Sequence, residues 1–136
     1  MRIPLIDVSS SWPVILIAER DKRMRALQQF FLEREGFAVA FEADEQSAFE
    51  AVHSTSPAVL VTEILIGKMD GLALCRRVRE HPETRQTPIV VFSILAAEAR
   101  AKEAGASAFL RKPLIGETFV AVIRQVIDAK PSVRME

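Results

Sequence analysis

The chain has 136 residues, of which 49% are hydrophobic and 26% are charged, and its 18 basic side chains balance 18 acidic ones to a formal net charge of zero. This length fits one domain with its own apolar core, and only 5 Gly and 7 Pro residues exclude a low-complexity or fibrous chain. The balanced charge argues against nucleic acid or an anionic membrane as a partner, because such binding usually requires a cationic excess.

The cysteine, the histidines and the apolar stretches exclude further kinds of site and segment. A single cysteine, Cys75, excludes an internal disulfide, and the two separated histidines, His53 and His81, do not form a metal site. The longest apolar stretch, 89–97, is much shorter than the roughly 20 residues of a membrane-spanning helix. Asp7 interrupts the apolar N-terminus before it could serve as a secretion signal. We therefore expect a cytoplasmic protein.

The first elements follow one another within a few residues. Residues 14–18 are apolar throughout, which is typical of a strand covered on both faces. Asp21 is a candidate N-cap for a helix over 22–35, which Gly36 ends. Residues 37–41 alternate in size and predict a second strand.

The rest of the chain continues this alternation. In chain order, the segments are a helix from Asp44 that ends before Pro57, a strand over 58–62, a loop over 63–69, a helix from Asp70 that stops at His81, a strand over 89–92, a helix over 96–104, a strand over 108–110 and a helix over 117–128. We expect Arg76, Arg77 and Arg79 to form a solvated helix face. The predicted domain covers 14–130, between an N-terminal extension and a C-terminal tail.

Five strands that alternate with five helices predict an α/β fold, a doubly wound parallel sheet with helices on both faces. Ligands of such sheets bind at the carboxyl ends of the strands. The residues expected there are Glu19, Arg20 and Asp21 after the first strand, Glu63 after the third, Ser93 after the fourth and Lys112 after the fifth. No glycine follows the first strand, so a phosphate loop is excluded, and a lone cysteine excludes a thioredoxin-like site.

The order of these residues resembles the CheY-like receiver domains of bacterial two-component response regulators, over roughly residues 14–129. That family has an acidic pair after strand one, a phosphoacceptor Asp after strand three, Met-Asp-Gly further on, Ser or Thr after strand four, and Gly-Ala followed by Lys-Pro around strand five. This chain has Glu19-Arg20, Glu63, Met69-Asp70-Gly71, Ser93, Gly105-Ala106 and Lys112-Pro113 in that order. The resemblance implies a flavodoxin-like sheet of order 2-1-3-4-5, and it makes Pro113 a candidate cis-proline.

Two positions depart from the family pattern. Glu63 stands at the phosphoacceptor position, and Arg20 stands where the second acid of the pair belongs. The resemblance implies self-phosphorylation with a Mg²⁺ ion that offsets three carboxylates and one lysine, a set with two net negative charges. Here Glu19 and Glu63 face Arg20 and Lys112, so the expected local charge is zero. We expect no metal; if one binds, Glu19 and Glu63 are its ligands.

Arg20 and Glu63 each have two interpretations. The forked guanidinium of Arg20 could bridge Glu19 and Glu63 in place of Mg²⁺, or it could turn outward into solvent. Glu63 reaches about 1.5 Å further than Asp would. It could therefore approach Ser93 or Lys112 as a partial mimic of the phosphorylated state, or it could be a solvated loop acid.

The resemblance makes Ser93 and Phe109 a switch pair, in which a hydroxyl bonds the phosphoryl group and an aromatic ring turns inward behind it. Phe109 could equally be an ordinary core ring. The segment from Ser93 to Lys112 is short for the family, which favours a fixed binding surface formed by the fourth helix, the fifth strand and the fifth helix.

We therefore expect a stand-alone receiver of phosphorelay signalling, a pseudo-receiver that acts by phosphorylation-independent protein–protein interaction. It is not expected to be an enzyme beyond residual self-phosphorylation, and no cofactor is expected. Its partner would be a histidine kinase or a downstream effector on that face, or a second copy in a homodimer. Two alternatives stay open: a Mg²⁺-dependent receiver that accepts the phosphoryl group on Glu63 or Asp70, and a structural dimerisation module. Asp70 is the weaker acceptor because Asp-Gly at a helix start is explained by an N-cap.

Overall fold

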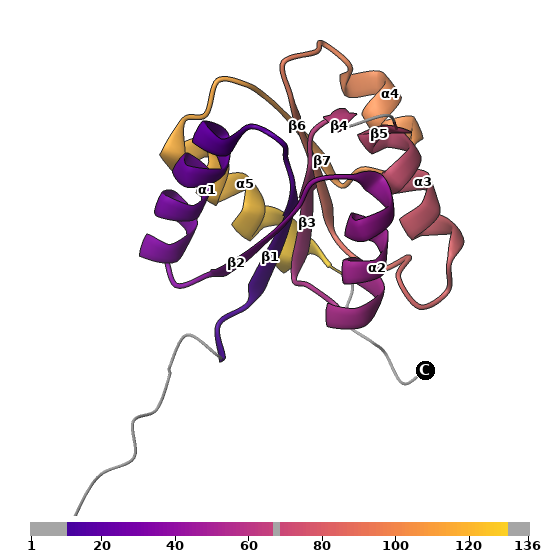
Figure 1. Ribbon diagram of the computed structural model, residues 1–136, viewed down its shortest axis with the longest axis horizontal. Coiled ribbons are helices and arrows are strands. Elements are labelled where there is room, and N and C mark those ends of the chain that lie inside the picture. Colours follow the sequence, from indigo (N-terminus) through magenta and orange to yellow (C-terminus); the bar gives the residue numbers. More distant parts are fainter. Residues whose placement is uncertain (1–10, 67–68, 131–136) are drawn as a thin grey trace, which may run out of the picture.

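Five parallel strands form the central sheet of the computed structural model, which describes residues 11–66 and 69–130 (Figure 1). The strands are β1 (Val14–Ala18), β2 (Ala38–Glu42), β3 (Val59–Thr62), β6 (Ile89–Ser93) and β7 (Ala108–Arg111). Their order across the sheet is β2-β1-β3-β6-β7, with every neighbouring pair parallel. Counted among themselves, these strands have the order 2-1-3-4-5, so the predicted doubly wound topology is confirmed.

Five helices cover the two faces of the sheet in the described part of the chain. They are α1 (Lys22–Arg34), α2 (Glu45–Thr55), α3 (Gly71–Glu80), α4 (Glu98–Glu103) and α5 (Gly116–Ala129). In Figure 1, α1 and α5 lie on one side of the sheet, and α2, α3 and α4 lie on the other. Successive strand side chains point to opposite faces. Ile15 and Ile17 therefore pack in one core cluster with Leu32 of α1, whereas Leu16 and Ala18 pack in the second cluster.

Three aspartates start helices as the sequence predicts. Asp21, Asp44 and Asp70 are the N-caps of α1, α2 and α3, and each side chain accepts a hydrogen bond from backbone N–H groups of the first helical turn. These bonds lower the pKa of Asp21 and of Asp44, because they favour the ionised carboxylate. The chain then reverses after α1 at Gly36, whose φ of 89° is readily adopted by glycine.

The structure differs from the predicted elements in two places. The predicted loop over 63–69 contains a short antiparallel hairpin of β4 (Leu65–Ile66) and β5 (Met69–Asp70). The helix predicted over 96–104 is shorter, because its N-cap, Ala97, has no side-chain acceptor for the free N–H groups of the first turn.

The ends of the chain lie largely outside the described residues. The predicted N-terminal extension, 1–13, is described only from Ser11, and the predicted tail, 131–136, is not described. Among the helices of residues 11–66 and 69–130, none has both the length and the apolar character that crossing a membrane requires.

Two arginines of α3 have structural partners. The Arg77 guanidinium forms an ion pair with the buried carboxylate of Glu45 at 3.2 Å and lies 4.1 Å from the centroid of the Phe49 ring. Arg79 Nε donates to the carbonyl oxygen of Gly105 at 2.8 Å. The prediction of a solvated face is therefore wrong for both arginines, because their partners come from elements distant in sequence.

Burial makes Cys75 on α3 chemically inert, which leads to the first prediction. The apolar surroundings raise the pKa of its thiol to about 12, so roughly one thiol in 10⁴ is ionised at pH 8. Only the thiolate attacks disulfide reagents. We expect the folded protein to react with Ellman's reagent at pH 8 at least about a hundredfold more slowly than the protein in urea. Fast reaction of the folded protein, followed by absorbance, would contradict this placement.

Candidate functional site

The carboxyl edge of the sheet brings together side chains that follow three different strands. Ala18 of β1 pairs with Thr62 of β3, so the next residue on each strand, Glu19 and Glu63, is placed side by side. Lys112 follows β7 at the same edge. All three side chains are nearly buried, with exposed fractions of 5% for Glu19, 6% for Glu63 and 10% for Lys112.

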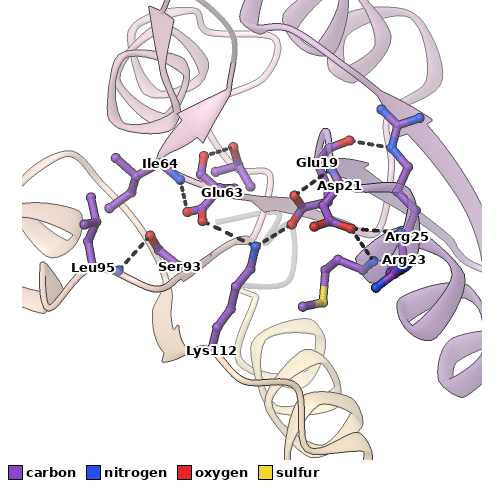
Figure 2. Close-up of polar contacts among 11 residues, drawn as sticks. Glu19, Asp21, Arg23, Arg25, Glu63, Ile64, Ser93, Leu95 and Lys112 are labelled. Carbon is purple, nitrogen blue, oxygen red and sulfur yellow. Dashed lines mark hydrogen bonds and ion pairs between the residues drawn. The ribbon is translucent and has the colours of Figure 1, made fainter.

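Lys112 bridges the two carboxylates. Its Nζ lies 2.8 Å from Oε1 of Glu19 and 3.3 Å from Oε1 of Glu63. Figure 2 shows the ammonium group between the two acids, reaching up from the β7 side of the site. The ammonium also lies 5.5 Å from the centroid of the buried Phe92 ring, within the range of a cation–π contact. Lys112 therefore donates a hydrogen bond to Glu19 and forms an ion pair with Glu63.

Backbone groups bind the remaining carboxylate oxygens. Oε2 of Glu19 accepts from the N–H of Asp21 at 3.2 Å, and Oε2 of Glu63 accepts from the N–H of Ile64. Each buried carboxylate therefore has one lysine partner and one backbone partner. Such pairing is needed because an unpaired charge in a protein interior costs several kcal/mol in lost hydration. The cluster contains two carboxylates and one ammonium group, which leaves one net negative charge.

Arg20 takes no part in this cluster. Its side chain is exposed, and it forms no hydrogen bond or ion pair with any residue in the described ranges. The hypothesis that Arg20 bridges Glu19 and Glu63 is wrong, because Lys112 already occupies the space between the two acids. The predicted local charge of zero is corrected with it, since the charge of Arg20 lies in solvent and not at the buried edge.

The loop after Glu63 is held by a close backbone approach at Gly71. The N–H of Gly71 donates to the carbonyl oxygen of Ile64 at 2.8 Å. A Cβ atom at Gly71 would lie 2.0 Å from the carbonyl oxygen of Glu63, so only glycine fits. The hydroxyl of Thr62 donates to that same carbonyl at 2.9 Å. These contacts give the Asp-Gly motif a structural reason and fix the backbone that carries Glu63.

Lys112 is positioned by its own backbone. Its N–H donates to the carbonyl oxygen of Ser93 at 2.9 Å, which extends the pairing of β6 with β7 by one residue. The peptide bond that follows, to Pro113, is cis. From this position after β7, the side chain of Lys112 reaches the carboxylates after β1 and β3.

The two predicted switch residues lie in different surroundings. Ser93 is fully buried, and its hydroxyl accepts a hydrogen bond from the N–H of Leu95 at 3.2 Å, in the loop that follows β6. Phe109 is half-buried and packs against the core cluster under α4. It also lines a surface hollow of about 480 Å³ together with Ala96 and Ala99. Ser93 therefore belongs to the carboxyl edge, and Phe109 belongs to the surface formed by α4 and β7.

Other acids near the edge have structural partners. Asp21 caps α1, and the exposed Asp70 caps α3 through a 2.7 Å hydrogen bond from the N–H of Ala73. Within residues 11–66 and 69–130, no group of three or more His, Cys, Asp or Glu side chains is arranged to hold a metal ion. The carboxylates that lie close together at the edge are therefore Glu19 and Glu63, both bound to Lys112.

Arg25 is a contributor that the sequence interpretation missed. Its Nε donates to the carbonyl oxygen of Glu19, and its guanidinium lies 5.3 Å from the centroid of the Phe41 ring on β2. Arg25 thus holds the backbone of Glu19 from the α1 side. The available signal was its place in the first turn of α1, six residues after Glu19, from which a long side chain can reach back to the end of β1.

Comparison with known proteins agrees with this arrangement. The family model of the response regulator receiver domain matches residues 15–124. The chain is 34% identical over 116 residues to the transcriptional regulatory protein CseB of Streptomyces avermitilis, covering 83% of this chain and 48% of CseB. It is 27% identical over 125 residues to the transcriptional regulatory protein SrrA of Staphylococcus aureus, covering 90% of this chain and 51% of SrrA. The chain therefore spans about half the length of these relatives.

A solved structure has the same fold. A sensor protein from Polaromonas sp. JS666 superposes with a TM-score of 0.81 at 28% identity, over 88% of this chain and 98% of that one. The family model covers most of the chain, including all five strands of the central sheet except the first residue of β1. The protein therefore belongs to the response regulator receiver domain family of two-component signalling.

Proposed function

We propose that this receiver domain signals without accepting a phosphoryl group, as a pseudo-receiver that acts through protein–protein interaction. The observation that carries the proposal is the bridge from Lys112 to both Glu19 and Glu63. The ammonium group between the two carboxylates offsets one of their two negative charges, so this edge holds one net negative charge for a divalent ion, against two in the family pattern. The charged side chains at this edge are thereby paired with one another.

The donor set is a poor fit for Mg²⁺. The family arrangement described above leaves two net negative charges for the ion to neutralise, whereas the buried cluster here carries one. Arg20 stands at the position of the missing acid, and Asp21 is engaged as a helix cap. A divalent ion would have to compete with Lys112 for both remaining carboxylates. Magnesium also demands octahedral oxygen coordination, which two shared carboxylates supply weakly.

Glu63 supports a fixed signalling state. Its carboxylate contacts Lys112 at 3.3 Å and the backbone N–H of Ile64, so both oxygens are engaged. We propose that this contact holds the site in one state, in the manner of a partial mimic of phosphorylation. The hydroxyl of Ser93 accepts a hydrogen bond from the N–H of Leu95. In the proposed mimic, the partner of the Glu63 carboxylate is therefore Lys112 and not Ser93. The alternative acceptor, Asp70, is committed to the cap of α3.

The surface of α4, β7 and α5 is the proposed site of partner binding. Ile94 beside it is 56% exposed, and Arg111 holds the backbone there by donating from Nε to the Ile94 carbonyl at 2.9 Å. The hollow that contains Phe109 lies on the same surface. A fixed loop with an exposed apolar residue is suited to docking a histidine kinase or a downstream effector. Homodimerisation through this surface, and a cytoplasmic location, stay predictions.

Exposure to acetyl phosphate tests the central proposal. We expect no phosphoryl adduct by intact mass after incubation with acetyl phosphate and Mg²⁺, and no saturable Mg²⁺-dependent shift of the Glu19 or Glu63 amide signals. The physical reason is that Lys112 already pairs with both carboxylates and leaves one net negative charge, which attracts a divalent ion less than two would. A stable adduct on Glu63 or Asp70 would establish the phosphoryl-accepting alternative.

Restoring the acidic set should restore metal binding. In the double variant Arg20→Asp with Glu63→Asp, three carboxylates would face Lys112, which leaves the two negative charges that attract a divalent ion. We expect saturable Mg²⁺ binding by calorimetry in the double variant and none in the wild-type protein. The matched control is Arg20→Gln, which removes the positive charge and adds no ligand. Equal behaviour of all three proteins would overturn the charge argument.

Removal of the bridge should destabilise the fold. Lys112→Met leaves two buried carboxylates facing each other, and loss of one partner of a buried ion pair costs about 3–5 kcal/mol. We expect that loss in urea unfolding, with partial recovery when Glu63→Gln is added. Lys102→Met is the matched control, because Lys102 forms an exposed pair with Glu98 on α4. Such exposed pairs contribute about 0.5 kcal/mol. Similar losses in the two lysine variants would contradict the bridge.

A further inference from the structure

A second polar site lies at the opposite edge of the sheet, where β6 and β7 begin. A hollow of about 340 Å³ is formed there by the end of α3 and the segment after it, the starts of the two strands, and the end of α5. Its lining includes Arg79, Arg85, Ser107 and Lys130. The carboxyl-edge site follows the other ends of these strands, so the two sites are separate (Figure 1).

The lining is strongly cationic. Arg79, Arg85 and Lys130 contribute three positive charges, and the lining includes no aspartate or glutamate. The side chains of Arg85 and Lys130 form no ion pair or hydrogen bond with another residue of the described ranges. Three cations around one hollow repel one another, so an anion placed there would relieve that repulsion.

Arg79 is fixed in place by the backbone. Besides the bond from Nε to Gly105, its Nη1 donates to the carbonyl oxygens of Arg85 and Thr87 at 2.8 and 2.6 Å. A Cβ atom at Gly105 would lie 2.6 Å from the Arg79 side chain, so glycine makes room for the arginine. The guanidinium is therefore preorganised, and burial lowers its pKa because the charge is partly removed from water. A preorganised, partly desolvated cation binds an anion better than a mobile surface cation does.

The wall beside Arg79 presents unused hydrogen-bond donors. Ser107 Oγ accepts from the N–H of Ile89 at 3.0 Å and from Nη2 of Arg79 at 3.3 Å. Its own hydroxyl hydrogen has no acceptor among the described residues, and Nη2 keeps one free N–H group. The hollow thus offers a hydroxyl and three cationic groups to a ligand whose oxygens only accept.

Part of the lining is apolar. Pro88, Ala108, Val126 and Ala129 belong to it, so the hollow offers contacts for a carbon skeleton or a ring as well as for an anion. A phosphate monoester carries nearly two negative charges at neutral pH and three acceptor oxygens. This matches three cations better than a single carboxylate does. The volume also accommodates a small metabolite.

We propose that this hollow, formed by Arg79, Arg85, Ser107 and Lys130, binds a small organic phosphate monoester. The phosphate accepts hydrogen bonds from the arginines, the lysine and the Ser107 hydroxyl, and the organic part lies against Pro88 and the other apolar lining residues. The site is independent of phosphoryl transfer at Glu63. Binding of a ligand in this hollow gives the receiver a signal that does not depend on the residues of the carboxyl edge.

Titrations of the full chain with three probes test this site: adenosine 5′-monophosphate, inorganic phosphate and adenosine. We expect saturable binding of the nucleotide by calorimetry, with amide shifts centred on Ser107 and Ile89 and a shift of the Arg79 Nε signal. Inorganic phosphate should bind at the same place at least tenfold more weakly, and adenosine should not bind. Equal affinity for phosphate and the nucleotide would overturn the organic part of the proposal. Absence of saturable binding by either phosphate probe, or equal binding of adenosine, would overturn the site.

Matched variants locate the binding. Arg85→Gln with Lys130→Gln removes two exposed charges from the hollow and should weaken nucleotide binding at least tenfold, with an unchanged thermal unfolding temperature. Lys22→Gln with Arg23→Gln removes the same charge from the start of α1, at the other edge of the sheet, and should change the affinity less than twofold. Equal affinity losses in the two double variants would indicate a general charge effect and contradict the site.

Discussion

Two carboxylates at the ends of neighbouring parallel strands are buried together with a single cation between them, and the carboxyl edge of this receiver depends on that cation. Glu19 and Glu63 follow β1 and β3, whose register places them side by side. Without Lys112 their charges would repel each other in a region of low dielectric constant. With Lys112 between them, each acid has a cationic partner and a backbone N–H partner. The ends of β1, β3 and β7 are thereby tied together.

The backbone around this bridge leaves little freedom. Gly71 allows the carbonyl of Glu63 to approach α3 closely, Arg25 holds the carbonyl of Glu19, and the N–H of Lys112 extends the pairing of β6 with β7. These contacts come from α1, α3 and β7, so three separate elements determine the geometry of two side chains. A site closed in this way is suited to presenting a constant surface, in keeping with the proposed role in protein–protein interaction.

The two edges of the sheet have opposite electrostatic character. The carboxyl edge satisfies its charges internally and keeps one net negative charge in a buried cluster. The amino edge gathers Arg79, Arg85 and Lys130 around an open hollow in which Arg85 and Lys130 have no anionic partner within the described part of the chain. One receiver fold therefore combines an edge closed by its own ions with an edge whose charges are free to receive a ligand. The helix α3 connects them, since it begins against the carbonyl of Glu63 and carries Arg79 in its last turn.

The sequence by itself determined the alternation of strands and helices, the aspartate caps and the positions of the residues at the carboxyl edge. These features depend on local signals: apolar period, capping chemistry and the rule that parallel strands end at a common edge. Tertiary structure alone decided which cation lies between Glu19 and Glu63. Arg20 is adjacent to Glu19 in sequence, yet it points into solvent, whereas Lys112, which follows β7, reaches the acids. Tertiary structure also decided the surroundings of Arg77 and Arg79, because their partners lie on other elements. The physical reason is that a buried acceptor must be paired with a donor, so the buried acceptors determine which long cationic side chain lies beside them. The position of those acceptors is set only after the sheet has formed.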